Sequence, residues 1–205
     1  MTTRTAPAHK PSEMMEGQPH LQQRSREIQG YKQLRSLPLG MAEETIGQSV
    51  TMLNQLLADS ITLYNLYKKH HWQVAGPTFY ELHRLFDKHA GEVLASIDLI
   101  GERIQMLGGV SAGMPFDVAE RTKIERPPIG VESVPAILAR TVNAHATVIR
   151  TIRDGIELTE RNKDYGTNDL LMSDLLRMHE MHVWFVSQHL IDTPLVGEGN
   201  GHKGS

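Results

Sequence analysis

Residues 71–109 read HWQVAGPTFYELHRLFDKHAGEVLASIDLIGERIQMLGG. Gly76-Pro77 ends one helix, Thr78 can cap the next, and Gly108-Gly109 ends that second helix. Between these breaks, apolar residues recur mostly three or four positions apart, as on one face of an α-helix: Phe79, Leu82, Phe86, Val93, Ile97, Ile100, Ile104 and Leu107. The stretch therefore predicts the turn of a helical hairpin followed by a long amphipathic helix.

The sequence on either side of this stretch predicts three more helices. The first helix of the hairpin covers about residues 42–74, where apolar residues keep helical spacing. A third helix starts after Ser133, which can cap it, has Pro135 in its first turn, and continues to about residue 161. A fourth helix opens at Gly166-Thr167 and runs to about residue 191.

The lengths of the links decide how these helices are arranged. The first and second helices, and the third and fourth, are joined by short links and are therefore antiparallel hairpins. Residues 108–132 form a link of about 25 residues, long enough to travel the length of a bundle, with one short helix near Asp117. The expected fold is all-α: a ferritin-like four-helix bundle with one long crossover that carries a short helix.

Composition and charge set the broad class. The chain has 205 residues, of which 40% are hydrophobic and 22% charged, as in one globular domain. It has no cysteine, which excludes disulfides and thiolate metal sites. We expect no signal peptide and no membrane span, and hence a cytoplasmic protein.

The two ends of the sequence differ from the predicted domain at residues 42–192. Residues 1–41 are rich in proline and glycine and are predicted to be a flexible tail, as are the Gly-rich residues 193–205. The first tail has a net charge of +3, because Glu13, Glu16 and Glu27 oppose six basic residues: Arg4, Lys10, Arg24, Arg26, Lys32 and Arg35. This charge is only weak evidence for contact with DNA, because the interspersed glutamates and the acidic remainder of the protein oppose it; the alternative is a solubilising or shell-packing tail.

Two pairs of metal-ligand residues share one line of the second helix. His83 and Asp87 are four residues apart, as are Asp98 and Glu102. His83 and Asp98 are separated by about 22 Å of helix, too far for one metal ion. A second copy of the helix, antiparallel across a two-fold axis, would bring the pairs together and give two equivalent sites. His71 can join the His83 side.

Mixed imidazole and carboxylate ligands suit Fe(II), Mn(II) or Zn(II), and carboxylates favour a ferric product. The alternative is that Asp98 and Glu102 are surface charges beside Arg103, and that His83 only bonds a backbone carbonyl. An ordinary ferritin site inside one subunit uses Glu-x-x-His motifs. No histidine of this chain has a glutamate three residues before it, which favours the site shared between chains.

The same residues carry a resemblance to the Dps family, the mini-ferritins named as DNA-binding proteins from starved cells. The resemblance covers about residues 43–192 and excludes both tails. It rests on these elements at the family's spacing: His71-Trp72, Gly76, Phe79, Leu82-His83, Asp87, Asp98-x-x-x-Glu102-Arg103 and Leu107-Gly108-Gly109.

The resemblance implies an iron-oxidising and iron-storing protein. It implies a two-metal ferroxidase centre with His71, His83 and Asp87 from one subunit and Asp98 and Glu102 from its partner. It also implies a homododecamer that oxidises Fe(II) with hydrogen peroxide, more slowly with dioxygen, and stores ferric mineral. Zinc is a possible substitute for iron. The alternative is a nucleoid DNA-binding stress protein whose metal site is structural or vestigial.

Other residues carry weaker expectations. His182, two residues before Trp184, is a candidate extra ligand, although a surface or core role is favoured for it; His89 faces away from Asp87 on the helix, and His179 has no assigned role. Trp72 and Trp184 are predicted core aromatics. Asp169 and Asp174 resemble the acidic residues of an iron-entry pore, but acidic residues also stabilise helix N-termini.

Overall fold

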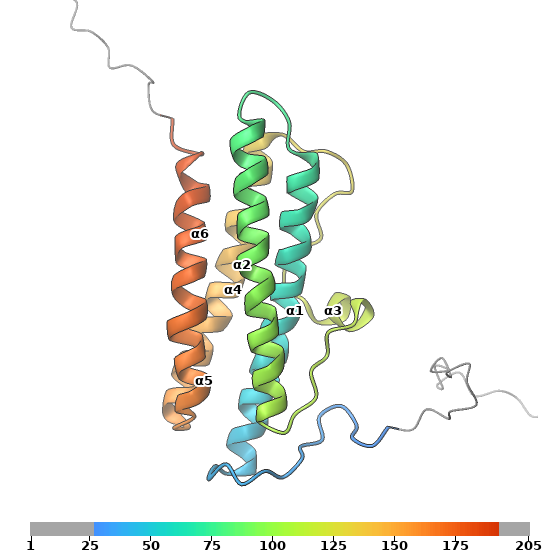
Figure 1. Cartoon of the computed structure of the whole chain (residues 1–205), viewed down its shortest axis with the longest axis vertical. Coiled ribbons are helices and arrows are strands. Elements are labelled where there is room, and N and C mark those ends of the chain that lie inside the picture. Colours follow the sequence, from blue (N-terminus) through green and yellow to red (C-terminus); the bar gives the residue numbers. More distant parts are fainter. Residues whose placement is uncertain (1–26, 193–205) are drawn as a thin grey trace, which may run out of the picture.

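The computed structural model describes residues 27–192, and Figure 1 shows them as an upright bundle of helices. Helix α1 spans Glu43–Gln73, α2 Phe79–Met106, α3 Pro115–Arg121 and α4 Val134–Arg161; then follow α5 Tyr165–Asp169, the π-helical segment η1 Leu170–Leu176 and α6 Arg177–Gln188. The described part of the chain contains no strand. The all-α bundle with a long crossover carrying the short helix α3 is confirmed.

The core lies where the apolar stripes of the four helical rods meet. Helices α1 and α2 pack as an antiparallel hairpin, and α4 and the η1–α6 rod form the second hairpin beside it (Figure 1). The fully buried apolar side chains come from every rod, for example Leu53, Leu63, Phe86, Ile100, Ile152 and Leu175. Each such side chain contributes about 1.5–3 kcal/mol by leaving water. Within residues 27–192, no helix combines the length and apolarity that crossing a membrane requires.

The fourth rod begins at Tyr165, one residue before the predicted Gly166, and ends at Gln188, three residues before the predicted end at about residue 191. Asp164, rather than Gly166 or Thr167, is the N-cap residue of α5, and its carboxylate accepts a hydrogen bond of 3.2 Å from the backbone N–H of Thr167. The rod is also interrupted by the π-helical segment η1, which hydrophobic spacing alone does not reveal. Thr78 precedes α2, but its side chain makes no capping hydrogen bond, so that predicted role was wrong.

A buried polar network ties three helices together at one end of the bundle. The carboxylate of Asp164 accepts hydrogen bonds from the Ser49 hydroxyl at 2.7 Å and from the Arg103 guanidinium at 2.9 Å. Arg103 Nε also donates to the hydroxyl of Thr167 at 2.9 Å. Burial opposes ionisation of Asp164, but these hydrogen bonds and the nearby cation outweigh it and lower its pKa. Arg103 therefore joins α2 to the start of α5 within one chain.

Gly108 lets the N-terminal segment cross the end of α2. Its φ is +79°, and a Cβ there would lie 2.2 Å from the carbonyl oxygen of Arg35. The backbone N–H of Arg35 donates to the Gly108 carbonyl at 2.8 Å, and Leu34 packs against the core. Residues 27–41 thus form no helix but contact the bundle. The remaining predicted tail residues, 1–26 and 193–205, lie outside the described part of the chain.

Candidate metal centre

His71 and His83 face each other across the α1–α2 turn. His71 Nδ1 donates to the carbonyl oxygen of His83 at 2.7 Å, and His83 Nδ1 donates to the carbonyl of His71 at 2.8 Å. Their rings are stacked, with centroids 3.8 Å apart. A carbonyl can only accept, so both protons sit on Nδ1, and a neutral imidazole then has its Nε2 lone pair free. This pair is built as two oriented ligands for a cation.

Asp87 adds an oxygen ligand next to these histidines. Its Oδ1 lies 3.9 Å from His71 Nε2 and accepts a hydrogen bond of 2.7 Å from the ammonium of Lys68. That hydrogen bond, with the charge of Lys68, lowers the pKa of Asp87. The carboxylate is therefore ionised at neutral pH, and Lys68 is the cation that neutralises it in the isolated chain.

Asp98 and Glu102 lie farther along α2, and both are exposed. Within residues 27–192, neither carboxylate takes part in a recorded hydrogen bond or ion pair. The neighbouring Arg103 is bound to Asp164 instead and pairs with neither of them. Their exposure also agrees with the alternative that they are ordinary surface charges. Because α2 is one continuous helix from Phe79 to Met106, Asp98 stays about 22 Å from His83 within a chain.

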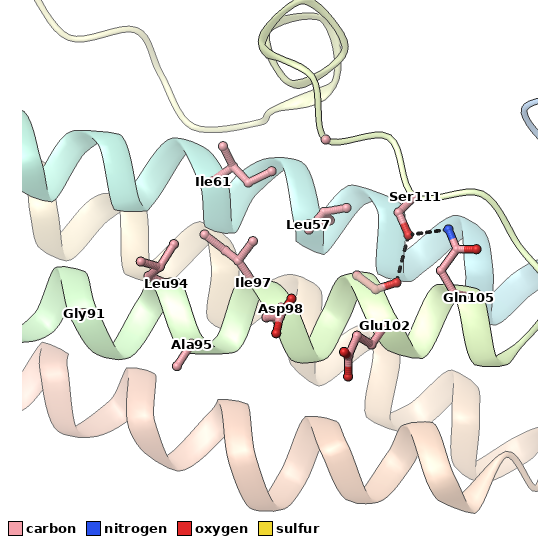
Figure 2. A pocket seen from close by; sticks show the side chains of 12 residues that line it. Leu57, Ile61, Gly91, Leu94, Ala95, Ile97, Asp98, Glu102, Gln105 and Ser111 are labelled. Atoms are coloured by element: carbon pink, nitrogen blue, oxygen red, sulfur yellow. Dashed lines mark hydrogen bonds between the residues drawn. The ribbon is translucent and has the colours of Figure 1, made fainter.

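An apolar groove surrounds the two free carboxylates. Figure 2 shows Asp98 and Glu102 on α2 beside Leu94 and Ile97 of that helix, with α1 residues such as Leu57 forming the other wall. Leu94 is 50% exposed in the isolated chain. The groove thus places the two carboxylates of α2 beside exposed apolar side chains.

The two tryptophans do not belong to the core, contrary to the sequence-based prediction. Trp72 is 71% exposed and Trp184 is 60% exposed. On α1 the core-facing positions near Trp72 are His70 and Val74, and a residue two positions from His70 points about 200° away from it. Both indoles lie on the outside of the isolated chain and are available for contacts with another subunit.

Asp169 and Asp174 also lie at the surface. Asp169 is the last residue of α5 and accepts a hydrogen bond of 2.8 Å from Ser173, whereas Asp174 lies within η1. Asp164 is the N-cap residue of α5 and Asp169 that of η1, and neither Asp169 nor Asp174 makes a side-chain capping hydrogen bond within the described residues. Their role in an entry pore stays a prediction.

His182 is not part of the His71–His83 group. Its ring is fully buried in the bundle, and its Nε2 donates to the carboxylate of Glu92 at 2.6 Å. His89 and His179, to which no role was assigned, are buried beside it. Sequence reasoning missed the cluster because its residues come from different helices. A histidine at a core position, such as His145 between Thr141 and Val148 on the buried face of α4, was the available signal.

Comparison with known proteins agrees with this architecture. Residues 50–196 match the family model of the ferritin-like domain. The structure of DpsC from Streptomyces coelicolor is 48% identical, with a TM-score of 0.82 over 83% of this chain and 99% of that one. The DNA protection during starvation protein of Halobacterium salinarum is 30% identical over 84% of this chain and 92% of its own.

A Nostoc protein named nutrient stress-induced DNA-binding protein is 33% identical over 75% of this chain and 83% of its own length. These likenesses run through nearly the whole length of the relatives, and they include the hairpin that carries His71, His83 and Asp87 and the helix that carries Asp98 and Glu102. The family match itself covers residues 50–196, which contain all five of these side chains. The chain therefore belongs to the Dps family of ferritin-like proteins.

Proposed function

We propose that this protein oxidises Fe(II) at sites shared between two subunits and stores the ferric product, which protects the cell from oxidative damage. One observation carries the proposal. The chain presents two half-sites: imidazoles with free Nε2 lone pairs at the α1–α2 turn and, about 22 Å along α2, carboxylates that pair with no cation among residues 27–192. Each half-site has the ligands that the other lacks.

A two-fold axis joins the half-sites. If α2 of one subunit lies antiparallel to α2 of its partner, His71, His83 and Asp87 of one chain face Asp98 and Glu102 of the other, and two equivalent centres form. The apolar groove around Asp98 and Glu102 supplies the contact surface for this pairing. Dimers built in this way assemble into the dodecameric shell that the family resemblance implies, with Asp169 and Asp174 as candidate pore residues.

The ligand types fit the chemistry of the substrate. Two imidazoles and three carboxylates hold Fe(II), and the hard carboxylate oxygens stabilise Fe(III) once it forms. One hydrogen peroxide takes one electron from each of two Fe(II) ions and two protons from solvent, giving two Fe(III) and two waters. Because peroxide is reduced by two electrons, no hydroxyl radical is released. Dioxygen is the slower oxidant, and Zn(II), which accepts the same ligands, competes for the site.

The test is anaerobic oxidation of Fe(II) by hydrogen peroxide, followed through the ferric absorbance. The assembled native protein is compared with the variant Asp98→Asn/Glu102→Gln, whose oligomeric mass is checked first. We expect rapid oxidation in the native protein and a rate at least about 100-fold lower in the variant, since both oxygen ligands of one half-site are lost. Equal rates in both, no faster than iron in buffer, would refute the proposal.

A second candidate function is DNA binding. The Nostoc relative is named for this activity, and the net charge of residues 1–41 is +3. Twelve such tails on one shell would act together, since multivalency raises avidity without new contacts. A gel shift at low salt with native and tail-deleted shells tests it: loss of binding with iron oxidation intact assigns DNA to the tail and places the protein on the nucleoid within the cytoplasm.

A further inference from the structure

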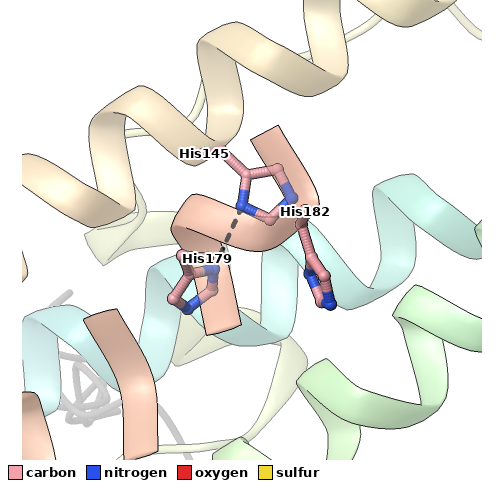
Figure 3. A group of neighbouring side chains, drawn as sticks. All are labelled: His145, His179 and His182. Carbon is pink, nitrogen blue, oxygen red and sulfur yellow. Dashed lines mark hydrogen bonds between the residues drawn. The ribbon is translucent and has the colours of Figure 1, made fainter. Parts of the chain in front are cut away.

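A second group of potential ligands lies inside the bundle, away from the shared half-sites. His145 of α4 and His179 and His182 of α6 are all fully buried, and one nitrogen of each ring lies within 4.8 Å of the others. Figure 3 shows the three rings gathered between the two helices. Histidines of this number in a bundle core need an explanation, because apolar side chains would fill the same space at no cost in desolvation.

The hydrogen bonds of the group leave two nitrogens unused. Tyr67 Oη lies 2.5 Å from His145 Nε2, and His145 Nδ1 lies 3.0 Å from His179 Nδ1. His182 Nε2 donates to Glu92, which puts its proton on Nε2 and leaves its Nδ1 as a bare lone pair. Both His182 Nδ1 and His179 Nε2 are buried, and neither has a hydrogen-bond partner among residues 27–192. A buried polar atom without a partner costs about 1–3 kcal/mol.

The rings are held in the form that binds metal. Burial lowers the pKa of His179 to about 3 and lowers that of His145 well below its ordinary value, with the neighbouring histidines acting in the same direction. Burial also lowers the pKa of His182, against the opposing effect of Glu92. All three imidazoles are therefore neutral at physiological pH, and a neutral imidazole is a ligand for first-row transition metals.

We propose that His145, His179 and His182 bind one divalent transition-metal ion, of which Zn(II) is the best match, inside each subunit. The site is distinct from the shared centre and does not rest on the proposed function. Three neutral nitrogens suit tetrahedral Zn(II) with one further ligand. At Zn–N bonds of about 2.0–2.1 Å, ligand nitrogens lie about 3.4 Å apart, close to the 3.0 Å between the Nδ1 atoms of His145 and His179.

Two side chains, Glu92 and Tyr67, would orient the histidine rings by contacting the ring nitrogens that do not bind the ion. Glu92 accepts the Nε2 proton of His182, which is the carboxylate–histidine arrangement that commonly supports a metal-bound imidazole. The hydroxyl of Tyr67 lies in the same position behind His145. If an ion binds the two facing Nδ1 atoms, both neutral rings must carry their protons on Nε2, so the proton between the two Nδ1 atoms moves to the Nε2 of its own ring. The N–H of His145 then points at Tyr67. The contacts of Glu92 with His182 and of Tyr67 with His145 are thus already present in the folded protein.

The surrounding helices provide access and alignment. The side chain of Glu92 is 34% exposed and pairs with the solvent-exposed Lys88, so Glu92 links the buried rings to solvent. The π-helical segment η1 ends three residues before His179. A wide π turn rotates the helix that follows it, and such turns recur at functional sites. His179 and His182, three apart, both point to the interior after it.

The test uses assembled full-length protein in which the shared site is removed by His83→Asn, Asp98→Asn and Glu102→Gln. Co(II), a spectroscopic stand-in for Zn(II), is titrated into this background and counted by elemental analysis. We expect one Co(II) per chain, the intense visible bands of tetrahedral cobalt, and displacement by Zn(II). Adding His179→Leu or His182→Gln should abolish the bands, whereas adding His189→Gln, at an exposed histidine beyond α6, should leave them unchanged.

Two results would overturn the proposal: no tightly held metal in the background protein, or bands that survive both cluster substitutions. If a cluster variant does not fold, X-ray absorption of the Zn(II)-loaded background protein replaces it. Three imidazole ligands per zinc would support the site, and fewer than three would overturn it. Because the background lacks the shared centre, the outcome is separate from whether the protein oxidises iron.

Discussion

The two histidine groups of this protein place the same side chain in different surroundings. His71 and His83 are partly buried at a helix turn. Each donates its Nδ1–H to a backbone carbonyl and leaves its Nε2 free. The interior group of His145, His179 and His182 is fully buried and comes entirely from one chain. In the proposed centre, the first group has Asp87 from its own chain but takes Asp98 and Glu102 from a second subunit, so it is coupled to assembly. The second is complete once the bundle folds, so it is coupled to folding.

The largest expected effect is that of acid on the free energy of unfolding, which depends on the buried histidines. Burial lowers the pKa of His89 and of His179 to about 3, whereas the unfolded chain has histidine pKa values of about 6.5. As the pH falls, the unfolded chain therefore takes up protons before the folded one. The stability that these neutral rings provide is complete above about pH 6.5 and is lost toward about pH 3. We expect a loss of roughly 2 kcal/mol for each of the two histidines between pH 7 and pH 5.

Chemical denaturation of the metal-free protein at several pH values, followed by helical circular dichroism, measures this loss. The variant His179→Leu should show a flatter dependence on pH, because one of the titrating groups is removed. The variant His71→Asn/His83→Asn, which leaves the interior group intact, is measured beside it. The same slope in the native protein and in the His179 variant would contradict the assignment of acid sensitivity to the interior.

The second expected effect concerns the exposed pair. Replacing His71 and His83 by asparagine removes both imidazole ligands of the shared centre and should slow peroxide-driven iron oxidation by at least about 100-fold. The interior group is untouched, so tetrahedral cobalt should still be observed in that variant. Stopped-flow absorbance measures the rate of iron oxidation, and cobalt spectra of the same sample show whether the interior group still binds metal. Iron oxidation at the native rate would remove these histidines from the centre.

The smallest expected effect comes from Lys68. Its ammonium lies 2.7 Å from Asp87 and competes with any cation bound there. The change Lys68→Met should raise the affinity of the shared centre for Co(II) by about threefold to tenfold, because one like charge is removed from a solvated site. Competition titrations with a chelating dye measure the change, and Arg161→Met, at an exposed cation on α4, is the control. Weaker binding would show that Lys68 positions Asp87 more than it opposes the metal.

The sequence predicted the fold well because the signals for it are local. Helical periodicity, glycine-containing breaks and link lengths placed α1, α2 and α4 to within a residue or two and predicted α3 in the crossover. The fourth rod was harder to predict. Its cap, Asp164, is also the buried partner of Arg103, and its π turn depends on how the rod packs rather than on spacing.

For the shared centre, helix geometry alone separated His83 and Asp87 from Asp98 and Glu102, because a helix rises about 1.5 Å per residue whatever surrounds it. The proposal that two chains contribute to one centre therefore rests on the sequence alone. The interior group was decided only by tertiary structure, because Tyr67, Glu92, His145 and His182 come from four helices whose rotation relative to one another depends on side-chain packing. A linear pattern records the spacing within a helix but not which faces of different helices meet.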